Sequence, residues 1–266
     1  MAAALTRTLV NVPEALEELL IVVVVTAAVV AVHAFLQRRL RSEVLRRHND
    51  VAGYLFSAVG ILYAVLLGFV VVVVWQKYDA TVANVQDEVD AAADLYHVVD
   101  GFPPVARAAV RRDLAQYAHR MIEREWPAMA RGEDIPDAGA GLLDDASYRI
   151  DSFSPTSRRG LNAQQAAIND EQRLLDARRQ RLIHAAPAVP SILWFALIAG
   201  ALAMVAFCYV FGVENRPAQL LMTAILVGLI GMLFVVVYEF ATPFSGSVTI
   251  SSDGWTYLAQ RLADIR

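Results

Sequence analysis

The stretch VAGYLFSAVGILYAVLLGFVVVVVW, residues 51–75, contains no charged side chain. A helix of about 20 apolar residues is long enough to cross the hydrocarbon core of a bilayer. The many valines do not favour a strand, because an open strand leaves its backbone unsatisfied in lipid and no series of alternating segments follows that would build a barrel. The stretch therefore predicts a membrane-spanning helix.

Three further apolar stretches have the same character, at residues 19–36, 189–211 and 218–240. We interpret the first as a retained span, because acidic residues precede it and it is longer than the apolar region of a signal peptide. The last two are separated by a tight turn in which Asn215 is a candidate helix cap. The sequence therefore predicts four spans arranged as two hairpins.

The helical pattern does not stop at the end of the second span. Apolar residues continue at steps of four and three, at Tyr78, Val82, Val85, Val89, Ala92, Tyr96 and Val99. This spacing is typical of a helix that packs along one stripe. One helix is therefore expected over residues 51–99, about 70 Å long at about 1.5 Å per residue, extending from the membrane into a soluble helical bundle.

The rest of the soluble region also predicts helices, at residues 104–126, 138–150 and 155–186. Pro127 is expected to end the first of these. The apolar positions expected to pack are Val110, Leu114, Tyr117 and Met121 in the first helix and Leu161, Ile168, Leu175 and Leu182 in the last. The soluble region is thus predicted to be a helical bundle.

The predicted fold class is an all-α membrane protein whose two transmembrane hairpins flank this bundle. The expected divisions are an N-terminal tail over residues 1–18, a hairpin over 19–78, the soluble domain over 79–187, a second hairpin over 188–241 and a C-terminal tail over 242–266. A short amphipathic helix is expected in that tail around Trp255, Leu258, Leu262 and Ile265.

Composition narrows the functional classes. With 57% hydrophobic residues, the chain is too apolar for one soluble core, and its net charge of -4 argues against a nucleic-acid partner. A single cysteine, Cys208, excludes an intrachain disulfide. The sequence shows no metal-ligand spacing, P-loop, nucleophile elbow or dinucleotide-binding glycine pattern, so no metal, cofactor or enzymatic activity is expected.

The arginines predict an orientation. Five lie in the link between the first two spans, at Arg38, Arg39, Arg41, Arg46 and Arg47, whereas the N-terminal tail has one arginine and three glutamates. The positive-inside rule places this link in the cytoplasm and both termini and the soluble domain outside. Arginines just before the third span, on the other side of the membrane, favour the opposite orientation. They belong to a long loop, however, and the rule gives less weight to charges in long loops.

Several residues within or beside the spans are candidates for function. The second span carries small residues on one helical face, at Gly53, Ser57, Gly60, Ala64 and Gly68, which predicts a packing seam or, alternatively, a pore-lining surface. His33 in the first span either reaches the membrane interface or has a functional role. Asn49 and Asp50 either cap the second span or attract ions at a pore mouth, and Glu239 requires a partner or water.

A set of motif residues resembles a known family. The set is Asn49, Asp50, Gly53, Tyr54, Ser57, Tyr78, Asp79, Glu125, Trp126, Pro127, Glu239, Pro243, Phe244, Ser245 and Gly246. Over residues 47–252 the sequence resembles the bestrophin-like domain family of bacterial membrane proteins. Its ending is also similar to the Glu-Leu-x-x-Pro-Phe-Gly stretch of bacterial bestrophins.

The likeness to bestrophins implies a homo-oligomeric ion channel of the bacterial inner membrane, pentameric in bestrophins, with the second span lining the pore. Its implied partners are the lipid bilayer, further copies of the chain and inorganic ions, with anion conduction as one option. Leu62, Leu66 and Phe69 are then candidates for an apolar constriction, since rings of apolar side chains can gate by dewetting.

Two features depart from bestrophins. The acidic calcium clasp of animal bestrophins has no counterpart after Phe244, where the first acidic residue is Asp253. The orientation predicted above also differs from theirs, because the soluble part and termini of bestrophins are cytoplasmic. The alternative function is a non-conducting membrane scaffold or sensor whose helical soluble domain binds a partner.

Overall fold

The computed structural model describes residues 8–10, 12–39, 49–133, 135, 139–186, 188–213 and 215–264. The chain forms two compact units. The membrane unit comprises Asn11–Gln76 and Pro187–Ala241, and the bundle unit comprises Met1–Val10, Lys77–Ala186 and Thr242–Arg266. One helix, α3, contributes residues to both units.

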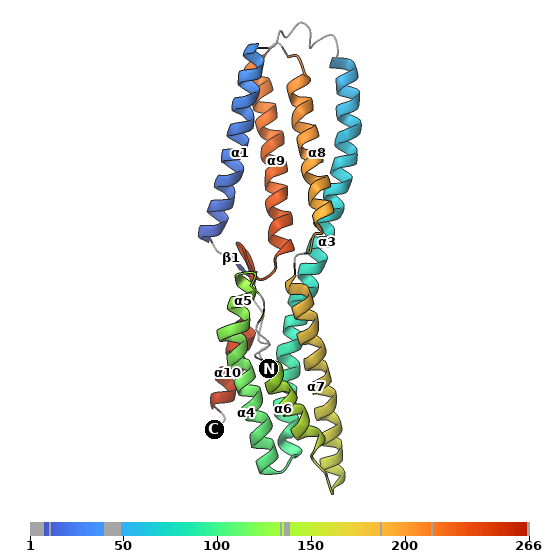
Figure 1. Ribbon diagram of the computed structural model, residues 1–266, viewed down its shortest axis with the longest axis vertical. Coiled ribbons are helices and arrows are strands. Elements are labelled where there is room, and N and C mark those ends of the chain that lie inside the picture. Colours follow the sequence, from blue (N-terminus) through green and yellow to red (C-terminus); the bar gives the residue numbers. More distant parts are fainter. Residues whose placement is uncertain are drawn as a thin grey trace. The chain divides into compact units, whose positions relative to one another are not determined.

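The membrane unit contains α1 (Val12–Arg39), the first part of α3 (Asn49–Val98), α8 (Ser191–Val210) and α9 (Arg216–Ala241). Figure 1 shows these four helices running alongside one another. Each is long and apolar enough to cross a membrane. The predicted all-α class with four spans is confirmed.

The core of the membrane unit joins α3 to α8 and α9. Its buried members include Tyr63, Leu67, Val70, Val74, Leu197, Met204 and Val237. Gly200 on α8 is needed for this packing, because a Cβ there would overlap the Tyr63 ring. The first span packs on the last: a Cβ at Gly231 of α9 would lie 3.0 Å from Val22 Cγ1 of α1. The sequence did not predict this pairing.

Polar contacts hold the turn between α8 and α9. The Asn215 side chain accepts a hydrogen bond from the Ala218 amide at 3.2 Å, which confirms the predicted cap. Asn49, at the start of α3, binds Gly212 in both directions, donating to its carbonyl at 2.8 Å and accepting from its amide at 3.0 Å. Asn49 therefore ties the start of α3 to this turn, while Asp50 is exposed.

The bundle unit contains the second part of α3 and a series of shorter helices. These are η1 (Val99–Gly101), α4 (Pro104–Arg120), η2 (Met121–Glu125), α5 (Trp126–Ala130), α6 (Ala140–Asp151), α7 (Arg158–Ala185) and α10 (Asp253–Asp264). Helix α4 packs against α6 and α10, and α6 packs against α7. The predicted stripe of α3 is buried apart from half-buried Val82, and Val110, Leu114, Tyr117 and Met121 of α4–η2 are buried, as predicted.

The predicted helix end at Pro127 is wrong. A π-helical segment, η2, follows α4, and the chain then continues as α5 to Ala130. Pro127 lies in the first turn of α5, where a missing amide proton and a fixed φ do no harm. The π-helical turn shifts the hydrogen-bond register immediately before the proline, so the helix ends one turn later than the sequence predicts.

The predicted apolar stripe of α7 is not buried within this one chain. Leu161 is 54% exposed, and Ile168, Leu175 and Leu182 are only half-buried. The buried face lies beside this stripe and consists mainly of small and charged residues, namely Gly160, Ala163, Ala167, Glu171, Leu174, Ala177, Arg178 and Arg181. Apolar spacing cannot identify such a face, because paired charges take the place of leucines.

Two short strands complete the bundle unit. Strand β1 (Thr8–Val10) pairs antiparallel with β2 (Val248–Ile250), with Thr8 opposite Ile250. The sequence predicted only tails at both places. A three-residue strand is too short to give a clear alternation, so its partner cannot be recognised from local pattern.

The segment before β2 turns sharply and anchors on α5. Gly246 has a φ of 97°, which favours glycine. The Phe244 ring packs edge-on against Trp126 with 5.4 Å between centroids, and the Trp126 indole donates to the Ile250 carbonyl at 3.0 Å. Trp255, Leu258 and Leu262 of α10 are buried as predicted, and Ile265 lies outside the described residues.

Candidate functional site

The candidate constriction residues lie on one side of α3 in the membrane unit. Leu62 is 72% exposed and Phe69 is 68% exposed, whereas Leu66 packs at the edge of the core. Steps of four and three residues place them on neighbouring turns of one helix side. Leu62 and Phe69 are therefore large apolar groups that the described chain leaves uncovered.

The small residues of α3 divide into two sets. A Cβ at Gly53 would lie 3.9 Å from the Phe211 ring, and one at Gly60 would lie 3.4 Å from Met204 Cε, so both glycines face α8. Ser57, Ala64 and Gly68 are exposed, and nothing lies within 4 Å of a Cβ built at Gly68. At 3.6 residues per turn, this second set lies roughly a third of a turn around α3 from Leu62 and Phe69.

The structure distributes the remaining motif residues between the two units. In the bundle unit, Tyr78 is buried and Asp79 is exposed. The Pro243 carbonyl accepts from the Ile250 amide at 2.9 Å, and the Ser245 amide donates to the Thr242 carbonyl at 3.1 Å. In the membrane unit, Glu239 is 2% exposed.

Of the arginines used to predict orientation, Arg38 and Arg39 lie in the last turn of α1. Arg41, Arg46 and Arg47 lie outside the described residues. The structure therefore adds nothing to the charge argument for this link.

A polar network inside the membrane unit joins α1 to α9. We call His33, Gln37, Gln219 and Thr223 the histidine network. The His33 ring is 1% exposed, with Nδ1 3.0 Å from Thr223 Oγ1 and Nε2 3.3 Å from Gln37 Nε2. His33 takes its polar partners from Thr223 of α9 and from Gln37 of α1 itself, so its ring is buried in the membrane unit and does not extend outward to the interface as expected.

Hydrogen-bond direction assigns the proton of His33. Thr223 donates its hydroxyl proton to the Gln219 carbonyl at 3.0 Å, so His33 Nδ1 must be the donor to Thr223. His33 Nε2 then accepts from Gln37, whose amide also donates to Gln219 Oε1 at 2.8 Å. Gln219 donates onward to the Phe211 and Cys208 carbonyls at 2.6 and 3.3 Å. The network is complete with His33 neutral.

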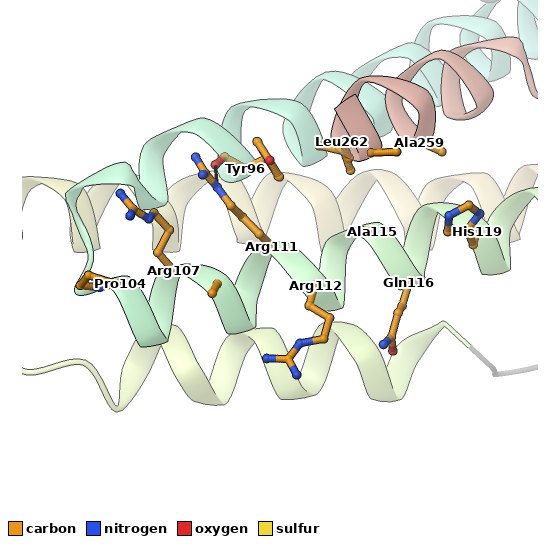
Figure 2. A pocket seen from close by; sticks show the side chains of 12 residues that line it. Tyr96, Pro104, Arg107, Arg111, Arg112, Ala115, Gln116, His119, Ala259 and Leu262 are labelled. Carbon is orange, nitrogen blue, oxygen red and sulfur yellow. Dashed lines mark hydrogen bonds between the residues drawn. The ribbon is translucent and has the colours of Figure 1, made fainter. Parts of the chain in front are cut away.

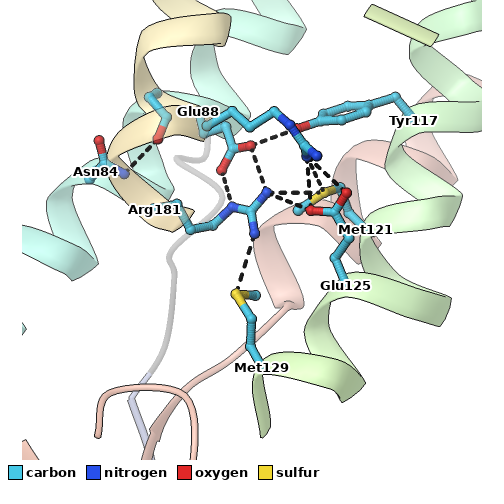
Figure 3. Close-up of polar contacts among 9 residues, drawn as sticks. Asn84, Glu88, Tyr117, Met121, Glu125, Met129 and Arg181 are labelled. Carbon is cyan, nitrogen blue, oxygen red and sulfur yellow. Dashed lines mark hydrogen bonds and ion pairs between the residues drawn. The ribbon is translucent and has the colours of Figure 1, made fainter. Parts of the chain in front are cut away.

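A second polar group is buried in the bundle unit (Figure 3). We call Glu88, Tyr117, Glu125, Arg178 and Arg181 the ionic cluster. The Arg181 guanidinium contacts Glu88 Oε2 at 2.6 Å and Glu125 Oε2 at 2.8 Å, and Arg178 Nη1 contacts both Glu125 oxygens at 2.8 Å. Tyr117 donates to Glu88 Oε1 at 2.7 Å. All five residues are at most 7% exposed as side chains, and they join α3, α4, η2 and α7.

Charge balance explains how these groups remain buried. Two guanidinium groups face two carboxylates, so the cluster is neutral overall, and ion pairing offsets part of the desolvation cost. Burial raises the pKa of the Tyr117 phenol well above its usual value, and Glu88 raises it further. Burial alone would lower the pKa of Arg181, but Glu88 and its other neighbours raise it.

Gly139, the residue just before α6, lies closely against this cluster. A Cβ at Gly139 would lie 2.7 Å from Glu125 Oε1 and 2.8 Å from Tyr117 Cε2. Only glycine therefore allows the chain to pass so near the ion pairs. The sulfur atoms of Met121 and Met129 lie 3.4 and 3.3 Å from the Arg181 guanidinium.

Sequence reasoning did not find the ionic cluster. Tyr117 was expected in the core and, with Glu125, in an incomplete group of polar residues, whereas Arg178 and Arg181 entered only as charges before the third span. A signal was available in the spacing of Arg178 and Arg181, which lie three residues apart on one side of α7. Among the described residues, no three His, Cys, Asp or Glu side chains are placed to hold a metal ion.

The architecture defines a four-span helical membrane protein with a helical bundle unit. The family model described as Bestrophin-like domain matches residues 23–254. The chain therefore belongs to the bestrophin-like domain family, as the motif residues suggested. No curated protein matches the chain.

Solved structures show the same fold. A mutant of a bacterial bestrophin homologue from Klebsiella pneumoniae is 15% identical, with a TM-score of 0.67 over 94% of this chain and 98% of that one. A second mutant of that homologue is 13% identical, with a TM-score of 0.66 over 94% and 99%. The structure of the homologue phased on zinc is 14% identical, with a TM-score of 0.64 over 94% and 97%. At these identities the likeness establishes the fold.

Proposed function

We propose that the protein is one subunit of a homo-oligomeric ion channel in which α3 lines the pore. Family membership supports this, because the related solved structures are named as bestrophin homologues and bestrophins are channels. The likeness extends over nearly the whole length of both chains, so it includes the membrane unit and the bundle unit.

The observation that carries the proposal is the uncovered side of α3. It combines large apolar groups at Leu62 and Phe69 with the exposed small residues Ser57, Ala64 and Gly68. Small residues let helix backbones approach closely within a membrane. A second copy of the chain can therefore pack beside α3 along the small residues, leaving the large apolar side chains directed at a central path. A ring of such side chains closes a pore by excluding water.

Whether the proposed channel would conduct cations or anions depends on the charges along its path. In the bundle unit α3 exposes Asp79, Asp87, Asp90 and Asp94. Fixed negative charge along a conduit attracts cations and repels anions, whereas anion conduction is an option that the bestrophin resemblance brings. Both classes of flux must therefore be measured on the same preparation.

The test is ion flux from proteoliposomes that carry the purified protein. We expect halide or cation flux that increases several-fold in the double variant Leu66→Ala/Phe69→Ala, because smaller side chains widen and wet the constriction. The matched control is Phe195→Ala/Leu202→Ala, which removes one phenylalanine and one leucine from the exposed surface of α8. The control should behave as the wild type.

The opposite result has a defined meaning. No flux in any variant, from protein shown to be folded and inserted, would favour the alternative of a non-conducting scaffold or sensor whose bundle unit binds a partner. Increased flux in both double variants would indicate general leakage. It would contradict the proposal that Leu66 and Phe69 form a constriction on α3.

For the orientation we propose a cytoplasmic α1–α3 link, on the positive-inside rule, with the bundle unit outside the bacterial inner membrane. The test uses Glu133→Cys, an exposed position of the bundle unit, in a Cys208→Ala background. Labelling of intact spheroplasts by an impermeant maleimide is expected. Labelling only after permeabilisation would place the bundle unit in the cytoplasm, as in bestrophins.

A further inference from the structure

A cavity of about 570 Å³ opens along one face of α4 in the bundle unit. Figure 2 shows Arg107 and Arg111 extending from α4 toward Tyr96 of α3, with Ala259 and Leu262 of α10 across the space. Arg112, Gln116 and His119 continue the lining along α4. We call this cavity the arginine groove.

The arginine groove has an excess of positive charge in a chain whose net charge is -4. The guanidinium groups of Arg107 and Arg111 line it, and the carboxylate that contacts them is Asp100, 2.9 Å from Arg111 and 3.5 Å from Arg107. Figure 2 shows the Arg112 side chain extending from the other side of α4, so it does not face the same space as Arg107 and Arg111. Two guanidinium groups that share one carboxylate leave an excess of positive charge for an incoming anion.

Arg111 is held in place before any ligand arrives. Its Nε donates to the Tyr96 carbonyl at 3.1 Å, and its guanidinium carbon lies 4.2 Å from the centre of the Tyr96 ring. An arginine on an ordinary solvent-exposed helix face would not be held against a neighbouring helix in this way. A prearranged guanidinium group loses less conformational entropy on binding, which favours affinity.

The opposite wall of the groove is apolar. Leu262 and Ala259 of α10 contribute it, and the cavity volume falls in the range of about 300–1,000 Å³ typical of small-molecule pockets. A free inorganic anion would satisfy the arginines and leave this wall unused. The combination fits a ligand that has both an anionic group and an organic body.

We propose that the arginine groove binds a small organic phosphate, with the phosphate group against Arg107 and Arg111 and the organic body against Tyr96 and Leu262. Phosphate is favoured over carboxylate because two guanidinium forks can share its oxygens and its second charge. The ligand site lies in the bundle unit, so it does not depend on whether α3 conducts ions.

Three probes separate the parts of this proposal in calorimetric titrations of the full-length protein at about 0.15 M salt, where distant charges are screened. Phenyl phosphate carries both features, inorganic phosphate lacks the organic body, and benzoate carries a carboxylate in place of phosphate. We expect saturable binding of phenyl phosphate at least about tenfold tighter than that of either other probe.

The variant Arg107→Gln/Arg111→Gln should weaken phenyl phosphate binding at least about tenfold. The control Arg124→Gln/Arg158→Gln removes the same charge from exposed positions outside the groove and should leave binding unchanged. Equal weakening in both double variants would show a general charge effect, and equal binding of benzoate would exclude the phosphate class.

Chemical protection of the unmodified protein provides a second readout that no folding defect can affect. Phenylglyoxal modifies exposed arginines, and mass spectrometry locates the adducts. Phenyl phosphate should reduce modification of Arg107 several-fold and leave Arg112, Arg124 and Arg158 unchanged. No saturable binding and no protection would overturn the proposal, whatever the flux assay shows.

Discussion

The ionic cluster of the bundle unit buries two guanidinium groups against two carboxylates, whereas the histidine network of the membrane unit buries an imidazole, two amides and a hydroxyl. In the ionic cluster each charge has an opposite charge within 3 Å. In the histidine network every group is neutral and each proton has one acceptor. Losing one member should therefore cost far more in the ionic cluster, because a charge is left behind.

The largest effect is expected for Arg181→Met. It leaves Glu88 and part of Glu125 without a cation in a fully buried site. Breaking a buried ion pair by removing one partner costs about 3–5 kcal/mol of unfolding free energy. Denaturant unfolding of the full-length protein in detergent measures this loss.

Fluorescence can confine that measurement to the bundle unit. In a Trp75→Phe/Trp194→Phe background the remaining indoles, Trp126 and Trp255, both lie in the bundle unit. The control is Arg131→Met, which breaks an exposed contact with Glu133 and should leave the unfolding midpoint unchanged. Equal midpoints for the two variants would mean that the ionic cluster does not hold α7 in place.

A smaller loss is expected for Tyr117→Phe. This substitution removes the hydrogen bond to Glu88 but leaves the contacts between Glu88 and Arg181 intact. A hydrogen bond to a charged group contributes about 1.5–3 kcal/mol. The same unfolding assay should rank this variant between wild type and Arg181→Met.

Tyr117 also gives the bundle unit a defined alkaline response. Its pKa is raised in the folded protein, first by burial and then by Glu88, so the folded state keeps the phenol protonated where the unfolded chain ionises, near pH 10. The resulting stability is complete below about pH 10 and is lost as pH rises further. Wild-type unfolding free energy should fall more between pH 9 and 11 than that of Tyr117→Phe. Parallel curves would contradict the assignment.

The two regions also differ in how far the sequence predicts them. The four spans and the stripe of α3 were predictable, because apolar residues at regular steps report burial directly. The buried face of α7 was not predictable by that rule, since Ala167, Glu171 and Arg178 hold the positions where the pattern requires large apolar groups. Charges become core residues only through partners on other helices, and one helix does not reveal them.

The histidine network shows the same limit inside the membrane unit. Thr223 and Gln219 lie far from His33 in sequence, and only the packing of α1 on α9 brings them together. The sequence predicted that the first span forms a hairpin with the second. The preference of α1 for α9 depends on shape, such as the space left by Gly231, which no periodicity encodes.

Gln219→Leu tests the histidine network in the same way as Arg181→Met tests the ionic cluster. We expect it to cost less unfolding free energy. It removes hydrogen bonds to Gln37 and to the carbonyls of α8 but leaves no charge unpaired. Hydrogen bonds between membrane helices contribute about 0.6–1.7 kcal/mol. The loss should therefore be about 1–2 kcal/mol, well below that of Arg181→Met.

The only cysteine of the chain provides the assay. Cys208 lies in α8 beside this network, so a thiol-reactive dye reports opening of the membrane unit during heating. Gln219→Leu should lower the labelling midpoint by a few degrees. Met222→Leu, on an exposed position of α9, should not. If Gln219→Leu destabilised the protein as much as Arg181→Met does, the expected difference between a neutral and a charged buried network would be contradicted.

The smallest effect is expected for His184 of the bundle unit. Within the described residues, its ring is not held in a hydrogen-bond network like that of His33. Burial, followed by the charge of Lys77, lowers the pKa of His184, and its Nδ1 has no hydrogen-bond partner within the described residues. The folded state therefore binds the proton less tightly than the unfolded chain, whose pKa is near 6.5. Its contribution to stability is complete above about pH 6.5 and declines as pH falls.

Between pH 7.5 and 5 the wild type should lose slightly more unfolding free energy than His184→Gln, whereas His119→Gln, at an exposed position, should follow the wild type. If His184→Gln followed it as well, the half-buried ring would be effectively solvated and would not couple folding to pH.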